Sequence, residues 1–173
     1  MKDNFSTSFS GKMAALTLAA GFMVASGGAA QAQMARPLQF SSPLLEILLS
    51  NPTYQDMLKQ FRDLVNSPAR EKLNPGDFQS MALFAFQGVA QNAVTTADAL
   101  ETITLMHSLC PDPLHRRAIS NAAKDILRFR PKAVTEVSAA FEKMLSNETD
   151  DNVRAYIEGM IKKLEMSRAS PAP

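Results

Sequence analysis

Prolines that directly follow helix-capping residues are the feature that most constrains how this chain can fold. Seven prolines lie between residues 42 and 166, and five of them follow Ser, Asn or Asp. Proline suits the first turn of a helix because the N–H it lacks would be unpaired there, and Ser, Asn and Asp are good caps. We therefore expect helices to begin near these pairs, while Pro131 ends one helix and opens the next. The five pairs are Ser42-Pro43, Asn51-Pro52, Ser67-Pro68, Asn74-Pro75 and Asp112-Pro113.

Apolar residues between these prolines recur every three or four positions, as they do on one face of a helix. The β-branched runs typical of sheets are missing, and the short connections favour antiparallel neighbours. At 173 residues the chain has room for one substantial domain. The pattern predicts a single all-α domain at 42–166, with six or seven antiparallel amphipathic helices in an irregular bundle or a short stack. The predicted helical segments are 52–66, 75–92, 96–109, 113–129, 131–145 and 149–166.

Residues 1–32 have the order of a secretory signal peptide. A start with two lysines precedes an apolar run of about 13 residues, and the small residues of Ala30-Gln31-Ala32 follow. A membrane-spanning helix needs about 20 apolar residues, so an uncleaved anchor is the less favoured alternative. We predict cleavage after Ala32 and export to the periplasm of a bacterium. A flexible leader at 33–41 and a disordered tail at 167–173 would flank the domain.

A faint internal repeat relates the segment at Asp112 to the segment at Asp151. Each begins with an acidic residue, followed by an apolar residue and an arginine (Arg116 and Arg154), at a spacing of about 38–39 residues. The two units, within 96–166, resemble the turn and second helix of a HEAT-type repeat, whose usual period is about 40–47 residues. This resemblance implies a stacked helical scaffold whose outer surfaces bind proteins. A plain irregular bundle is the alternative, because other amphipathic helices can share the pattern.

His107, Cys110 and His115 are the strong transition-metal ligand types after residue 32, and they fall within nine residues. With Asp112 as a fourth ligand, they could hold zinc or copper. However, the spacing matches no standard metal motif, and both histidines continue apolar helical stripes. We therefore expect the histidines at the edge of the core and Cys110 as a small buried side chain. The prediction is that the chain binds no metal or other cofactor.

Residues suited to catalysis are sparse in this sequence. Its single cysteine excludes an internal disulfide, and no clustered glycines could cradle a phosphate after residue 32. His107 stands one helical turn from Cys110, but no family signature or candidate oxyanion loop accompanies the pair. The absence of tryptophan and the presence of only two tyrosines argue against a glycan-binding site. We therefore predict that the protein is not an enzyme.

A concentration of basic residues at 115–132 is the most distinctive surface feature. This segment carries six Lys or Arg and one Asp. Arg117, Lys124 and Arg128 recur on one helical face, which could dock an acidic protein or anionic lipid headgroups. An ordinary solvated face is the competing interpretation. The balance of 18 basic and 17 acidic residues, without interleaved aromatics, argues against nucleic acid and leaves at most peripheral membrane association.

Two functions are compatible with these features. The one we favour is an exported, non-catalytic module for protein–protein interaction, such as an adaptor, an immunity protein or an accessory subunit of an envelope assembly. The alternative is a periplasmic protein that binds a small molecule or a metal through the region of His107, Cys110 and His115. The oligomeric state stays open, because the apolar segment 78–89 would be buried equally in a monomer or in an obligate interface.

Overall fold

A computed structural model describes residues 40–169, and this part of the chain contains seven α-helices and no strand. The predicted all-α fold class is therefore confirmed. Three short 3-10 turns lie between the helices: η2 (Pro68–Lys72), η3 (Ile126–Arg128) and η4 (Pro131–Ala133). The helices are α2 (Ser42–Leu49), α3 (Tyr54–Val65), α4 (Pro75–Ala90), α5 (Thr96–Leu109), α6 (Pro113–Asp125), α7 (Val134–Asn147) and α8 (Asp151–Ala169).

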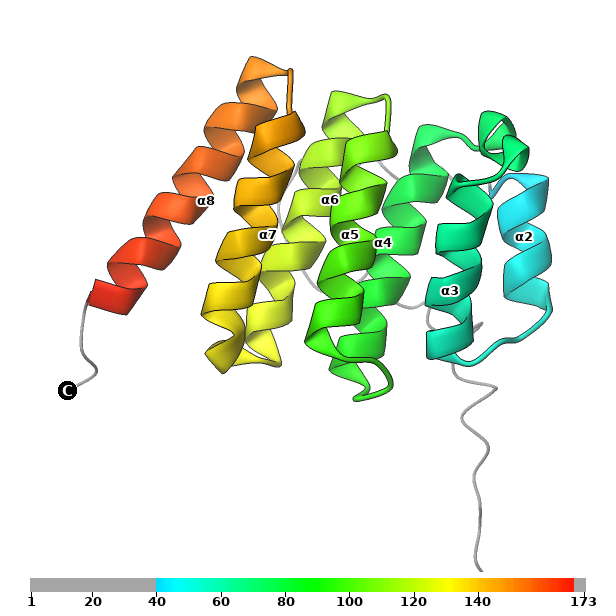
Figure 1. Cartoon of the computed structure of the whole chain (residues 1–173), viewed down its shortest axis with the longest axis horizontal. Coiled ribbons are helices and arrows are strands. Elements are labelled where there is room, and N and C mark those ends of the chain that lie inside the picture. The colour runs from blue at the N-terminus through cyan, green and yellow to red at the C-terminus, as the bar shows by residue number, and fades with distance from the viewer. Residues whose placement is uncertain (1–39, 170–173) are drawn as a thin grey trace, which may run out of the picture.

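The helices form a two-layer stack (Figure 1). In one layer α3 packs on α5 and α5 on α7, and in the other α4 packs on α6 and α6 on α8. Consecutive helices also pack against each other across the layers, so the molecule is a row of three hairpins: α3/α4, α5/α6 and α7/α8. Helix α2 stands at one end of the row and α8 at the other.

The hairpins follow one another with a constant period. Helices α4, α6 and α8 begin at residues 75, 113 and 151, so each starts 38 residues after the one before. Helices α5 and α7 begin at 96 and 134, again 38 residues apart. The repeat noticed over 96–166 therefore corresponds to α5/α6 and α7/α8, and the same period reaches back to α4.

The helices α4, α6 and α8, which form one of the two layers, are capped in the same way at their first turn. A side-chain oxygen just before the helix accepts a hydrogen bond from the backbone N–H of the third helical residue, which would otherwise lack a partner. Because the caps recur with the hairpins, the proline-and-cap pattern and the repeat have one structural origin. The three bonds join Asn74 to Asp77 (3.1 Å), Asp112 to His115 (3.0 Å) and Asp150 to Val153 (3.0 Å).

Three prolines do not open α-helices where the sequence predicts them, and one of these, Pro68, opens only the 3-10 turn η2. Asn51 has a positive φ of 51°, and α3 begins three residues later, capped by Thr53, whose hydroxyl accepts from the Asp56 N–H. Proline disfavours the helical conformation in the residue before it, so the chain turns at Asn51 rather than starting a helix. Pro131 opens only the turn η4, and α7 starts at Val134.

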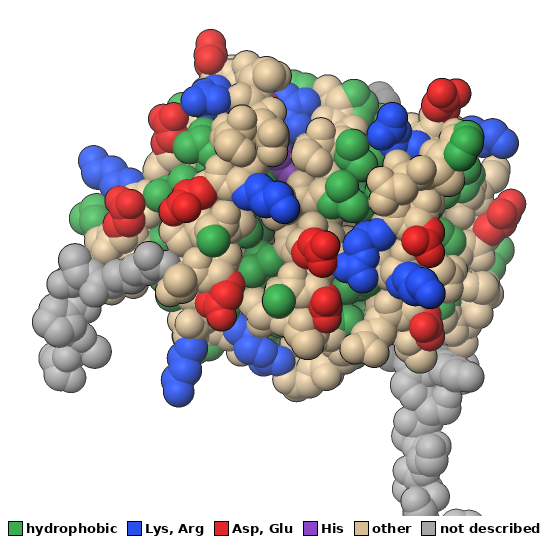
Figure 2. All heavy atoms as spheres, in the orientation of Figure 1, with side chains coloured by type: hydrophobic (Ala, Val, Ile, Leu, Met, Phe, Trp, Pro, Cys, Tyr) green, Lys and Arg blue, Asp and Glu red, His purple; other side chains and the backbone are tan. Residues whose placement is uncertain are grey.

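A continuous hydrophobic core runs through the stack, and every helix places at least one side chain in it with no exposed surface. Apart from Leu44 in α2, which precedes the predicted segments, these residues lie within the helical segments that the apolar periodicity predicts. On the face seen in Figure 2, basic and acidic side chains are interspersed around smaller apolar areas. The fully buried side chains, one from each helix in order, include Leu44, Phe61, Met81, Ile103, Ile119, Phe141 and Ile157.

The ends of the chain were predicted to carry segments outside the domain. The predicted signal peptide and residues 33–39 of the predicted leader lie outside the described residues. At the other end, α8 continues to Ala169, three residues into the predicted tail, and residues 170–173 are not described. Within 40–169, no helix is both long and apolar enough to cross a membrane.

Candidate functional site

The three predicted metal-ligand candidates lie where α5 ends and α6 begins, and they do not converge on one point. His107 is buried in the last turn of α5, with Nε2 3.3 Å from Glu148 Oε2. The buried Cys110 thiol faces the backbone carbonyl of Asp112 at 3.6 Å, and His115 Nδ1 lies 2.9 Å from the carboxylate of the same Asp112. Across residues 40–169, no group of three or more His, Cys, Asp or Glu side chains is arranged to hold a metal ion.

The protonation of these groups also argues against reactivity. Burial lowers the pKa of His107 to about 4 and outweighs the opposing effect of nearby Glu148, so the imidazole is neutral at pH 7. Burial likewise raises the pKa of the Cys110 thiol, which disfavours the thiolate that a nucleophile needs. His107 and Cys110 therefore behave as buried, uncharged side chains.

Beside His107 lies a buried ion pair that the sequence did not reveal. The Glu148 side chain, in the linker between α7 and α8, has no exposed surface. Arg116 binds this carboxylate through two hydrogen bonds from one side of its guanidinium group. Nε donates to Oε2 and Nη2 donates to Oε1, each at 2.8 Å. The backbone N–H groups of Thr149 and Asp150 add hydrogen bonds to Oε1 at 2.9 and 2.8 Å.

These donors keep Glu148 ionised in the interior. Burial on its own raises the pKa of Glu148, but the Arg116 hydrogen bonds and the two backbone N–H groups outweigh it, and the pKa lies below its usual value. Because the carboxylate is already satisfied and closed off from solvent, it has no room for a substrate. The cluster of Glu148, Arg116 and His107 is therefore a structural connection rather than a reactive centre.

Arg116 connects two linkers of the stack. Its Nη1 donates to the carbonyls of Cys110 and Pro111 at 3.1 and 3.2 Å, in the linker before its own helix. The opposite edge holds Glu148, 32 residues later in the chain. One side chain thus ties the α5–α6 linker to the α7–α8 linker and fixes the second hairpin against the third.

The three predicted partner-binding residues lie along α6 and the turn that follows it. Arg117 is exposed on α6, and its guanidinium carbon lies 4.7 Å from the centroid of the Tyr156 ring on α8. The Tyr156 hydroxyl donates to Asn121 Oδ1, which also accepts from Lys124 Nζ at 3.3 Å. These contacts hold Arg117 and Lys124 in place across α6 and α8.

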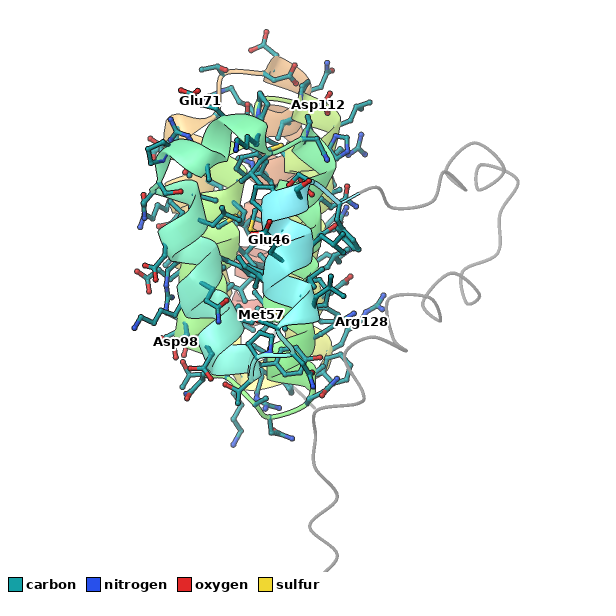
Figure 3. All side chains as sticks on the ribbon, turned by 90° about the vertical axis from the view of Figure 1, so that its right-hand side faces the viewer. Glu46, Met57, Glu71, Asp98, Asp112 and Arg128 are labelled. Atoms are coloured by element: carbon teal, nitrogen blue, oxygen red, sulfur yellow. The ribbon has the colours of Figure 1, made fainter. Side chains whose placement is uncertain are left out.

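Only part of this surface is neutralised by acidic groups. Lys124 Nζ and Arg128 Nε lie 3.7 and 3.5 Å from the same Asp125 carboxylate oxygen, whereas Arg117 forms no ion pair with any residue in 40–169. We refer to Arg117, Lys124 and Arg128 as the basic surface. Figure 3 shows Asp112, just before α6, near the top of the molecule and Arg128, just after α6, in the lower half, so the basic surface runs along α6.

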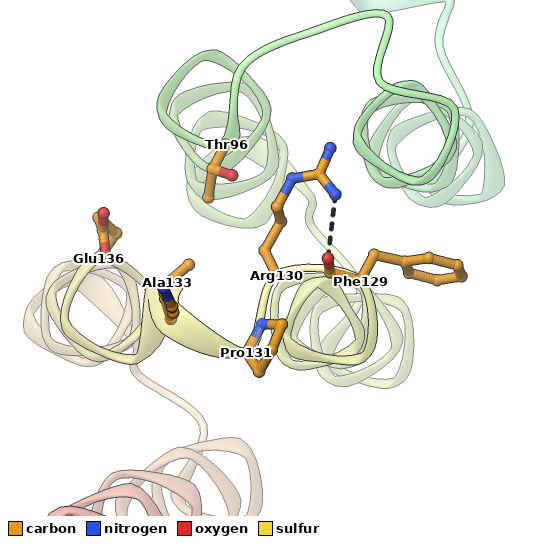
Figure 4. A pocket seen from close by; sticks show the side chains of 7 residues that line it. Thr96, Phe129, Arg130, Pro131, Ala133 and Glu136 are labelled. Carbon is orange, nitrogen blue, oxygen red and sulfur yellow. Dashed lines mark hydrogen bonds between the residues drawn. The ribbon is translucent and has the colours of Figure 1, made fainter.

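A shallow depression of about 360 Å³ lies where η4 meets the start of α5 (Figure 4). Arg130 contributes to its wall, but its guanidinium already donates to the carbonyls of Phe129 and Val89 at 2.9 and 3.1 Å. The depression therefore offers no free catalytic group from this arginine. It is lined by Thr96, Phe129, Arg130, Pro131, Lys132, Ala133 and Glu136.

Comparisons with known protein families, with curated proteins and with solved structures find no match for this chain. The HEAT-type resemblance of residues 96–166 therefore remains a prediction.

Proposed function

We propose that this protein is an exported, non-catalytic helical scaffold that binds an acidic protein partner through the basic surface. An adaptor, an immunity protein or an accessory subunit of an envelope assembly would fit this description. The observation that carries the proposal is the state of Arg117, which is exposed, held against Tyr156 and without an acidic partner among the described residues.

The arrangement of Arg117 favours binding over mere solvation. An exposed arginine normally loses rotamer freedom when it forms a contact, and this loss opposes binding. Stacking on the Tyr156 ring restrains the guanidinium before a partner arrives, and its planar donors match a carboxylate. Arginine and tyrosine are also enriched among the residues that dominate protein interfaces.

The stacked architecture supports the same proposal. Repeated hairpins form extended surfaces in which each unit contacts its neighbours, and such scaffolds commonly bind proteins. The apolar sequence before Ala32 supports export, with the periplasm as the proposed location.

Site-specific photocrosslinking in the native host tests this proposal. A photoreactive amino acid at Leu114, which is 76% exposed on α6, samples the basic surface without removing its charges. The same residue at Leu49, which is 64% exposed on α2, is the matched control. We expect a discrete crosslinked polypeptide from position 114 and none from position 49.

Charge reversal makes the crosslinking result specific. In the triple variant R117E/K124E/R128E, the adduct formed from position 114 should decrease by about tenfold or more, since like charges would then face an acidic partner. An adduct that persists in this variant, or forms equally from position 49, would contradict binding through the basic surface.

A further inference from the structure

Arg154 occupies in the third hairpin the place that Arg116 occupies in the second. Each is the fourth residue of its helix and follows a capping aspartate by four positions. Each Nη1 donates to the carbonyl two residues before that aspartate: Arg116 to Cys110 at 3.1 Å, and Arg154 to Glu148 at 2.9 Å. The two guanidinium groups therefore make the same contact with the backbone of the linker that precedes their helix.

The two arginines differ at the opposite edge of the guanidinium. Arg116 uses Nε and Nη2 to hold the buried Glu148 carboxylate. Arg154 makes no hydrogen bond through Nε or Nη2 to any residue in 40–169, and its nearest acidic group is Glu158, 4.0 Å from Nη2. Both side chains of that pair are exposed, at 40% and 57%, and such surface pairs hold each other weakly.

The surface around this edge is open to another polypeptide. Helix α8 stands at the end of the row (Figure 1), and beyond it the described residues contain no further hairpin. Ala139 on α7 and Ala155 and Gly159 on α8 are exposed. A Cβ atom built at Gly159 would meet nothing within 4 Å. Small side chains leave room for a second backbone to approach closely.

We propose that Arg154 binds a carboxylate presented by another polypeptide in a helix-to-helix turn, which packs on the exposed end formed by α7 and α8. The Arg116–Glu148 pair provides the precedent, because there the equivalent arginine binds a glutamate from the helix-to-helix turn of the next hairpin. The partner must therefore supply an Asp or Glu side chain at this end. The inference is independent of the basic surface on α6.

A synthetic peptide with the sequence of residues 146–153 (SNETDDNV) is the probe. Within the protein, Glu148 of this segment already binds Arg116, the equivalent arginine of the second hairpin. Its matched control carries Gln in place of Glu148 and keeps every other charge. Binding is followed by the NMR signals of the arginine Nε–H groups in the full chain. We expect a saturable shift of the Arg154 signal with the glutamate peptide, and affinity about tenfold lower with the glutamine peptide.

Variants separate this proposal from the others. Arg154→Met should abolish the response, whereas Arg62→Met, at a 29% exposed arginine on α3, should leave it intact. The Arg116 signal should not move, because Nε and Nη2 of Arg116 already donate to Glu148. An unmoved Arg154 signal, equal responses to both peptides, or binding that survives Arg154→Met would overturn the proposal. If only the Arg117 signal shifts, the carboxylate site at Arg154 is rejected while the basic surface stands.

Discussion

Arg116 and Arg154 begin equivalent helices in equivalent hairpins, yet only one of them is part of the interior. The Arg116 side chain is 14% exposed and its anion is fully buried, whereas Arg154 and its nearest carboxylate are both exposed. The local sequence places each arginine in the first turn of its helix, where it binds a carbonyl of the preceding linker. Whether the arginine also joins a buried ion pair depends on the next hairpin, which supplies Glu148 to Arg116. The same motif therefore contributes to stability inside the stack, and at the end of the stack it is the site for which we propose recognition.

Breaking the internal pair should have the largest effect. Arg116→Met leaves the ionised Glu148 buried without its counter-charge and should lower the free energy of unfolding by about 3–5 kcal/mol. Arg154→Met, the matched control, should cost about 1 kcal/mol or less because its surroundings are solvated. Urea denaturation followed by circular dichroism measures both. Similar losses for the two variants would refute the contrast.

Acid should destabilise the folded protein through His107, which lies beside Glu148. The unfolded chain has the ordinary His pKa of 6.5, but the folded pKa is about 4, so between these values only the unfolded state gains the proton. The free energy of unfolding should therefore fall as pH drops from 6.5 to 4, by on the order of 3 kcal/mol.

The His107→Leu variant sharpens this test, because it removes the titrating group while keeping a side chain of similar size. Its unfolding free energy should change less between pH 6.5 and 4 than that of the unsubstituted protein. Glu148, whose pKa is lowered, contributes stability that is lost only as pH falls further, through its own folded pKa. Parallel pH profiles for the two proteins would show that His107 is not the group responsible.

The repeated caps should respond alike if the hairpins are equivalent units. Asp112→Ala and Asp150→Ala each remove a side-chain acceptor for the N–H of the third helical residue, and each should cost about 1 kcal/mol. Thermal and chemical denaturation provide the comparison. A loss confined to one of the two variants would mean that the caps, despite their spacing, are not interchangeable.

The smallest effect on stability is expected at the basic surface. Arg117→Met removes an exposed cation from the Tyr156 ring and should cost less than about 1 kcal/mol. The same variant should reduce crosslinking from position 114 markedly. If stability falls as much as for Arg116→Met, the residue belongs to the structural frame rather than to a binding surface.

Local signals in the sequence were sufficient for most of the fold. Residues 96–109 form α5 as predicted, and Asn74-Pro75 opens α4 with the expected cap, because propensity and capping act over a few residues. Asn51-Pro52 was misread, since the same residue types also suit a turn in which Asn adopts a positive φ.

The buried ion pair could not be predicted in the same way. Glu148 lies in a polar linker that reads as solvated, and its partner Arg116 is 32 residues away. The one available signal was the recurrence of arginine at Arg116 and Arg154, which marked the hairpin period but not the carboxylate. The expected burial of Cys110 is confirmed, whereas His107 lies deeper than the core-edge position expected for it, because its depth depends on packing that no short motif encodes.

Native mass spectrometry tests the central claim of partner binding most directly. The protein would be extracted gently, after mild crosslinking, from the envelope fraction of its own cells. We predict a complex of this chain with a second polypeptide, and loss of that complex in the R117E/K124E/R128E variant. Detection of the chain alone, or of a complex that the triple variant retains, would contradict the proposed function.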